Sequence, residues 1–290
     1  PSRGLGDVYK RQLSIRLNER FLPFIVVWSG KVMKNINHLS PGFEFPETVI
    51  QVSEEEQRHK LSCCDIDGSI YGNEVDITML GLPTLEILMA ADVPVLGAVH
   101  LFQKFHQHSP FVLGEAIVVN GKIREVLPHE RGCILSCEFR YTDPMGNVRV
   151  EAQRSGIVPV GAKEKSHENF RPSEQLDGFL ERNRYLLNPK KVADFSSEAG
   201  NLIHSDPKVA KQHGFRAPIA AGLMGLHFYR KFIGENFETK SFDLQVWFRR
   251  PMFWDDELAL IIKEYNSKTF DMHLLGSNGK PTSNCRLKLY

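Results

Sequence analysis

The same order of segments occurs twice along the chain, and this repeat limits the possible folds more than any other feature. In each occurrence, an apolar segment precedes strand-like segments joined by a short turn rich in Gly, Pro, Asn and Asp. The apolar segments are Leu82–Ala91 and Ile219–Ile233, and the turns are Asp143–Asn147 and Ser277–Pro281. Turns of this composition connect neighbouring antiparallel strands. The pattern alone therefore predicts an α+β fold with an antiparallel sheet.

Strands are predicted around both turns, and a buried helix ahead of the second set. The predicted strands cover residues 114–126, 132–141, 148–152, 241–248, 257–265, 269–275 and 284–290. The second apolar segment stays apolar on nearly all sides as far as Arg230. A helix with so little polar surface is expected to be buried, here beneath the sheet.

A polar segment divides the chain into two predicted domains. Residues 163–178 are charged and contain Pro and Gly, as connecting segments do. The chain length also favours two units. We expect one domain over residues 33–162 and a second over residues 179–290.

Residues 1–32 are expected to be a leader that is not native to the protein. The first methionine is Met33, and residues 1–12 resemble a translated sequencing adapter. The apolar run Leu22–Trp28 is too short to span a bilayer. A signal peptide is the alternative, although no small-residue cleavage site follows cleanly.

Charge and cysteine content exclude some classes of partner. Residues 1–32 hold six of the 36 Lys/Arg and two of the 35 Asp/Glu, which leaves 30 against 33 and moves the net charge from +1 to −3. A nucleic-acid-binding protein would need a concentrated basic face. The five cysteines form no CxxC pair, so we expect buried reduced thiols and a cytoplasmic location. Cys133 and Cys137 would share one face of a strand.

A single stretch carries the chemistry. It reads Gly-Asn-Leu-Ile-His-Ser-Asp-Pro from Gly200, then Gly-Phe-Arg-Ala-Pro-Ile-Ala-Ala-Gly from Gly214 to Gly222. It resembles the signature of MaoC-like dehydratases and (R)-specific enoyl-CoA hydratases. Through about thirty residues the resemblance is close, and beyond them it is weaker. It implies a tandem or double hotdog fold, in which each half is a central helix wrapped by an antiparallel sheet.

The resemblance also implies an activity. His204 matches the family histidine that transfers a proton to or from water, and Gly222 matches the glycine whose backbone N–H binds the thioester oxygen. The expected reaction is hydration of an enoyl thioester or the reverse dehydration, in fatty acid metabolism. The substrate would be an acyl-CoA or an acyl-carrier-protein thioester, with no separate cofactor and no metal.

The residues around His204 are expected to shape its loop. Asp206 suits a helix N-cap, Pro207 the first helical position and Gly214 the end of that helix. His213 is expected to complement the dipole at the end of the same helix rather than to catalyse.

The family aspartate is missing. Read without gaps, it falls on Ala199, and with a shortened loop it falls on Asn201. Asn201 matches the family pattern and could act directly or only hold the turn by local hydrogen bonds. Asp194 and Glu198 are the nearest acids upstream, one helical turn apart. Glu198 is the better substitute because it is longer and closer to His204.

Two further functions stay open at this point. Without its aspartate the chain could bind acyl thioesters with weak or no activity, and a thioesterase is a third reading, because fold alone does not choose. The first half has no second motif, and its His100, His106 and His108 are expected to be solvated on a polar connection. That half would pair with the second as an internal pseudo-dimer. A further homodimer is possible, and no membrane partner is expected.

Overall fold

The computed structural model describes residues 39–95, 97–160, 172–197 and 200–290. The expected leader and residues 163–171 of the expected linker lie outside the described residues. We call residues 39–160 the N-terminal half and residues 172–290 the C-terminal half. The domain boundaries themselves stay predictions.

The described strands form a single sheet in which all neighbours are antiparallel. Their order is β1-β3-β4-β5-β2-β7-β10-β9-β8-β6. They are β1 (Thr48–Ile50), β2 (Val99–Gln107), β3 (Ile117–His129), β4 (Gly132–Thr142), β5 (Val148–Val158), β6 (Leu180–Leu186), β7 (Phe242–Phe248), β8 (Glu257–Asn266), β9 (Thr269–Leu275) and β10 (Pro281–Leu289).

The two halves follow the same strand order and meet at the centre of the sheet. Reading inwards from each edge, β1-β3-β4-β5-β2 matches β6-β8-β9-β10-β7. The halves join where Phe102–Gln107 of β2 pairs with Phe242–Trp247 of β7. The prediction that one sheet runs through both halves is thereby confirmed.

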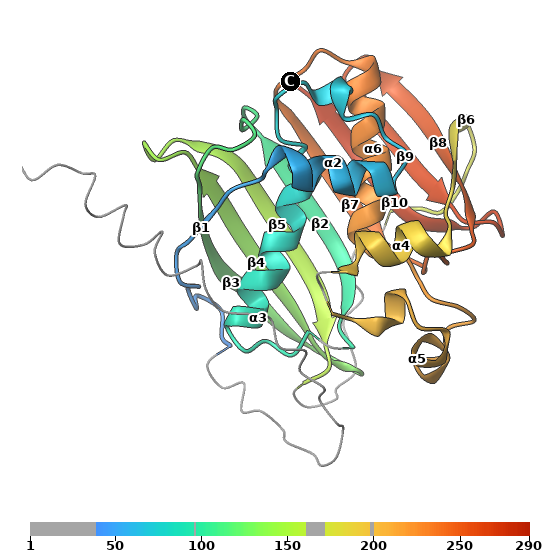
Figure 1. Ribbon diagram of the computed structural model, residues 1–290, viewed down its shortest axis with the longest axis horizontal. Coiled ribbons are helices and arrows are strands. Elements are labelled where there is room, and N and C mark those ends of the chain that lie inside the picture. The colour runs from blue at the N-terminus through green and yellow to red at the C-terminus, as the bar shows by residue number, and fades with distance from the viewer. Residues whose placement is uncertain (1–38, 96, 161–171, 198–199) are drawn as a thin grey trace, which may run out of the picture. The chain divides into compact units, whose positions relative to one another are not determined.

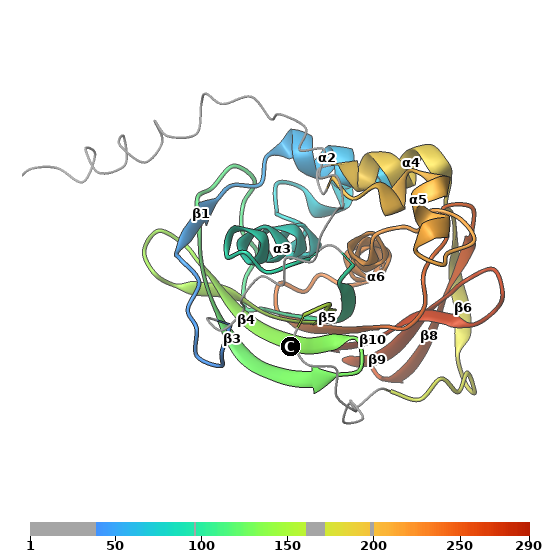
Figure 2. The same ribbon diagram turned by 90° about the horizontal axis from the view of Figure 1, so that it is seen from below.

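Helices cover one face of this sheet. They are α2 (Glu54–Cys63), α3 (Gly81–Ala90), α4 (Pro189–Phe195), α5 (Pro207–Gln212) and α6 (Gly222–Asn236), with short 3₁₀ turns η1 (Gly68–Tyr71), η2 (Ile77–Leu80) and η4 (Leu202–His204). Helices α3 and α6 lie side by side within the curve of the sheet, and α2 and α4 pack together above them (Figures 1 and 2). None of the described helices has the length and apolar character that crossing a membrane requires.

Helix α6 begins three residues later than the predicted segment Ile219–Ile233. The reason is local: Ile219 forms an antiparallel bridge with Phe253, and the N-cap Ala221 has extended backbone angles. The N–H groups of Ile219 and Ala220 donate to the carbonyl oxygens of Ile203 and Met252, at 3.2 and 2.8 Å. The helix itself is buried, as predicted.

The cysteines agree with the sequence analysis. All five are free and buried. Cys133 and Cys137 lie on the same face of β4, as expected from their spacing. Burial raises the pKa of the Cys137 thiol to about 12, so this thiol is protonated at neutral pH.

A buried polar contact also links the halves. Asp76 and His227 are 0% and 2% exposed, and the Asp76 carboxylate accepts a hydrogen bond from His227 Nδ1 at 2.8 Å. Burial opposes ionisation of Asp76, but His227 and Arg230 outweigh it, so the pKa of this carboxyl lies below its usual value. The ionised carboxylate therefore stabilises the fold above the ordinary carboxyl pKa, and this contribution is lost as pH falls through the lowered, folded-state pKa.

We expect Asp76→Ala to lower the free energy of unfolding by about 3–5 kcal/mol, because it leaves buried polar partners without their carboxylate. The matched control is Glu54→Ala, which removes an exposed ion pair with Arg58 and should cost at most about 1 kcal/mol. Urea titration of both variants measures the difference. Equal, small losses would show that the buried contact does not hold the halves together.

We also expect neither half to be soluble alone. Separation would expose the unpaired edge of β2 or β7 and the apolar face beneath α3 or α6. Expression of residues 39–160 and of residues 179–290, followed by gel filtration, tests this. A stable monomer of residues 179–290 would contradict it.

Candidate functional site

The loop that carries His204 is set by short-range capping. Asn201 precedes η4, and its side-chain oxygen accepts a hydrogen bond from the Ile203 N–H at 3.2 Å. This contact is the turn role considered for Asn201. A direct role for Asn201 in proton transfer stays a prediction.

Helix α5 closes the loop on its other side as the sequence predicts. The Asp206 side chain accepts from the Lys208 N–H at 2.7 Å, and Pro207 occupies the first helical position. His213 caps the other end and is exposed. Gly214 follows with a φ of +82°, a conformation that favours glycine. The loop geometry is thus encoded locally.

His204 is held in one tautomer. Its Nδ1 lies 2.7 Å from the carbonyl oxygen of Ile219, which can only accept, so Nδ1 carries the proton. Burial lowers the pKa of His204 below its usual value, although the bond to Ile219 opposes this shift. The ring is therefore neutral at pH 7. Its Nε2 is left with a lone pair that can take a proton from water.

The segment before α6 connects the histidine to the start of the helix. Ile219 donates its N–H to Ile203 and accepts from His204 through its carbonyl. On the other side, the Trp254 N–H donates to Pro218 O at 3.0 Å. Three residues after Ile219, α6 begins at Gly222. The structure thus brings the two principal predicted residues to the same short segment.

Gly222 lies against an aromatic ring. A Cβ on Gly222 would come within 3.1 Å of Phe248 Cε1, so glycine gives the close approach that a larger residue would prevent. The N-cap of α6 is Ala221, which has no side-chain oxygen to cap the helix. The positive end of the helix dipole can therefore act on a partner outside the helix.

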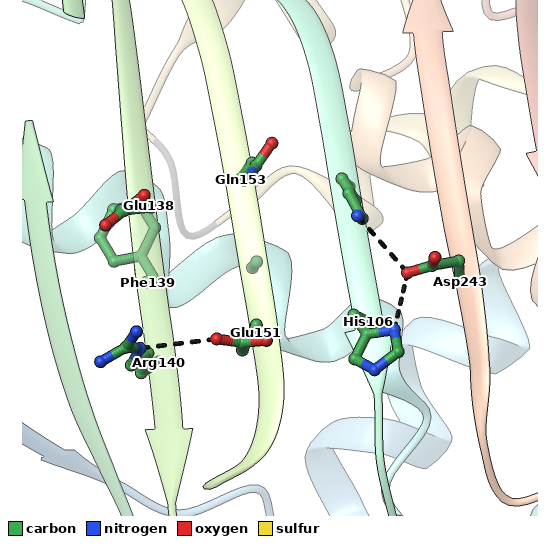
Figure 3. A pocket seen from close by; sticks show the side chains of 9 residues that line it. His106, Glu138, Phe139, Arg140, Glu151, Gln153 and Asp243 are labelled. Atoms are coloured by element: carbon green, nitrogen blue, oxygen red, sulfur yellow. Dashed lines mark hydrogen bonds and ion pairs between the residues drawn. The ribbon is translucent and has the colours of Figure 1, made fainter. Parts of the chain in front are cut away.

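The histidine run of the N-terminal half is not a polar connection, so that expectation was wrong. His100 and His106 belong to β2, a central strand, and His108 follows it directly. On the outer face of the sheet, His106 Nδ1 lies 2.8 Å from the Asp243 carboxylate (Figure 3). Residues around this pair, including Arg140, line a hollow of about 340 Å³.

The outer-face hollow is held together by its own ion pairs. Burial opposes ionisation of Asp243, but hydrogen bonds from Tyr290 and His106 lower the pKa of its carboxyl. Across the hollow, Arg140 lies 3.5 Å from Glu151 (Figure 3). Among the described residues, no group of three or more His, Cys, Asp or Glu side chains could hold a metal ion.

No family model and no curated protein matches the chain. Solved structures do match. HtdX from Mycobacterium tuberculosis superposes with a TM-score of 0.68 at 18% identity, over 83% of this chain and 98% of HtdX. A MaoC-like dehydratase from Phytophthora capsici gives 0.67 at 15% identity, over 85% and 95%. A Mycobacterium tuberculosis protein described as a double hotdog gives 0.63 at 11% identity, over 87% and 96%. This chain has a double hotdog fold.

The double hotdog confirms the predicted fold class. It also places a residue of the N-terminal half beside the candidate site, which the sequence analysis missed. His100 packs against Phe248, with ring centroids 4.4 Å apart and the rings tilted by 38°, and Phe248 contacts Gly222. Burial and the charge of Arg154 lower the pKa of His100 well below its usual value, so this ring is neutral. Only the pairing of β2 with β7 reveals this proximity.

The structure describes only some of the acids that could replace the missing aspartate beside His204. Glu198 and Ala199 lie outside the described residues. Asp194 lies on α4, and its carboxylate pairs with Lys190 one turn earlier. In the described ranges, no carboxylate forms a hydrogen bond or ion pair with His204. The role of Glu198 as a substitute acid stays a prediction.

Proposed function

We propose that this protein hydrates enoyl thioesters to 3-hydroxyacyl thioesters, or catalyses the reverse dehydration. The observation that carries the proposal is the neutral His204, oriented by its bond to Ile219 just before the start of α6 at Gly222. This arrangement supplies a base beside a group of backbone donors. Both are needed to add water across a conjugated thioester.

The helix start would act on the thioester oxygen. When water attacks Cβ, negative charge builds on that oxygen as an enolate forms. Backbone N–H groups at the start of α6, with Gly222 first, are oriented to donate to it, and the helix dipole favours the charge. The lack of a side chain on Gly222 permits the thioester to approach the backbone.

His204 alone can carry out both proton transfers of the reaction. Its Nε2 takes one proton from the attacking water as the C–O bond forms at Cβ. The resulting imidazolium then returns that proton to Cα as the enolate collapses to the thioester. Water is consumed and no other proton is needed. A neighbouring carboxylate would raise the efficiency of these transfers by orienting the water and stabilising the imidazolium.

The structural neighbours support this reaction class at the level of fold, since one is described as a MaoC-like dehydratase. The residue match at His204 and Gly222 adds support from the sequence. In this proposal the acyl group arrives on CoA or on acyl-carrier-protein phosphopantetheine, in the cytoplasm. No separate cofactor takes part.

A second function is favoured by one observation. No carboxylate in the described ranges forms a hydrogen bond or ion pair with His204, which suits a double hotdog that binds acyl thioesters with little or no turnover. One assay distinguishes the two functions. Loss of the enoyl absorbance reports hydration, release of free thiol reports thioester hydrolysis, and tight binding without either change favours the binding function.

We expect His204→Ala to lower kcat for hydration of crotonyl-CoA by at least ~10²-fold, because the proton acceptor is removed. His213→Ala is the matched control, since this exposed histidine caps α5 and takes no part in the proposed chemistry. Loss of absorbance at the enoyl band measures both. Equal rates in the two variants would remove the basis for assigning catalysis to His204.

We expect Ala199→Asp and Glu198→Gln to identify the acid. If the loop aligns without a gap, Ala199→Asp restores the family carboxylate and raises kcat, whereas Glu198→Gln lowers kcat only if Glu198 replaces that carboxylate. The same absorbance assay reads both. No turnover in the wild type and none gained in Ala199→Asp would contradict the hydratase proposal and favour the binding function.

A further inference from the structure

A polar cluster lies on the inner face of the sheet in the N-terminal half. Arg154 on β5 is paired across the sheet with Gln103 on β2, so the two side chains share a face. Arg154 Nη1 donates to the Thr84 hydroxyl at 3.4 Å. Because Thr84 belongs to α3, the guanidinium spans the space between the sheet and this helix.

Arg154 carries a charge that the described residues do not neutralise. Its close neighbours include the thiol of Cys137 and the phenol of Tyr141, both uncharged at neutral pH. Burial lowers the pKa of Arg154 to about 10, and the guanidinium still stays positive at pH 7. No ion pair joins it to an acid of the described ranges. Even a partly enclosed cation without an anion is unfavourable, and a bound anion would offset this cost.

Gln103 is a second and independent sign of a missing ligand. Gln103 is 0% exposed, yet its carbonyl oxygen makes no hydrogen bond of normal geometry among the described residues. His100 is close enough for a weaker interaction with the Gln103 side chain. The Gln103 amide nitrogen makes only one long contact, 3.4 Å to Lys104 O. Buried polar groups are nearly always satisfied, so the carbonyl oxygen indicates a missing donor such as a water, and the weakly bonded amide nitrogen beside the guanidinium can still donate to an anion.

The cluster begins close to the candidate site. Phe248 lies against both Gly222 and His100. His100 pairs with Gly156, two residues after Arg154 on β5, and the charge of Arg154 lowers the pKa of His100, so the guanidinium lies near that ring. Phe248, His100 and Arg154 all keep part of their surface exposed. An acyl chain that leaves the start of α6 towards the N-terminal half would meet these three side chains in turn.

We propose that Arg154 and Gln103 bind the far end of the acyl group, and that the preferred substrate is a short enoyl thioester whose chain ends in a carboxylate. Arg154 supplies the charge-assisted hydrogen bonds that a carboxylate accepts. The Gln103 amide nitrogen can donate to the same carboxylate, and a water bound to that carboxylate can donate to the Gln103 carbonyl oxygen. This inference rests on the proposed function, because it assumes that the thioester lies at Gly222.

The test compares two substrates that differ only at the chain end. These are trans-2-hexenoyl-CoA and its ω-carboxylate counterpart, followed by their shorter and longer homologues. For the wild type, kcat/KM is expected to favour the carboxylate-ended chain. Arg154→Met, which keeps the length but loses the charge, should lower that preference by about 10- to 100-fold. Gln103→Leu should also lower the preference for the carboxylate-ended chain, by a smaller factor.

The matched control is Arg140→Met. Arg140 lies on the neighbouring strand β4 but on the outer face, where it pairs with Glu151, so its loss should leave the preference unchanged. Thermal melts of each variant establish that the protein is folded. A purely structural Arg154 would lower kcat/KM for both chain ends equally in Arg154→Met, and this result would overturn the proposal. So would a wild-type preference for the methyl end.

Binding measurements test this inference independently of the proposed function. Hexanoyl-CoA and adipoyl-CoA cannot be hydrated, so calorimetric dissociation constants for the two report the chain-end preference without catalysis. Tighter binding of adipoyl-CoA that disappears in Arg154→Met supports the inference even if no thioester is turned over. Equal dissociation constants for the two ligands in the wild type, or no binding of either, would overturn it.

Discussion

The pairing of β2 with β7 is the interaction on which the rest of the structure depends. Along Phe102–Gln107 it turns two five-stranded halves into one sheet, and α3 and α6 then lie next to each other on the same face. The register of this pairing matters because side chains alternate between faces. A slip by one residue would move Gln103 and Phe105 to solvent and carry Lys104 and His106 beneath the helices. The candidate site and the Arg154 cluster adjoin only in the observed register.

Sequence reasoning could predict what is encoded locally. Turn chemistry located the strands around Asp143–Asn147, and the cap at Asp206 located α5. It failed for β2, whose residues were expected to be a solvated connection. The inner positions of this strand include Gln103 and Gln107, both buried, so the apolar alternation typical of a half-buried strand is broken. The Gln107 amide donates to a backbone carbonyl, which only the fold supplies.

In the candidate site too, only the locally encoded residues could be predicted from the sequence. His204 and Gly222 were found because the family signature is contiguous in the sequence, and the structure joins them through Ile219. His100 and Arg154 were not found, because their positions near the site follow from strand pairing between segments far apart in the chain. A single sequence contains no signal for such contacts. The polar side chains on the inner face of the N-terminal half were therefore recognised only from the structure.

The proposed mechanism requires the reacting thioester at the start of α6, and the position of a bound acyl group tests this most directly. A crystal structure with butyryl-CoA, which cannot be hydrated, would show it. We expect the carbonyl oxygen within hydrogen-bond distance of the Gly222 N–H, the Cβ atom facing His204 Nε2, and the chain running past Phe248 towards Arg154. An acyl group bound elsewhere, for example in the outer-face hollow beside His106, would contradict this mechanism.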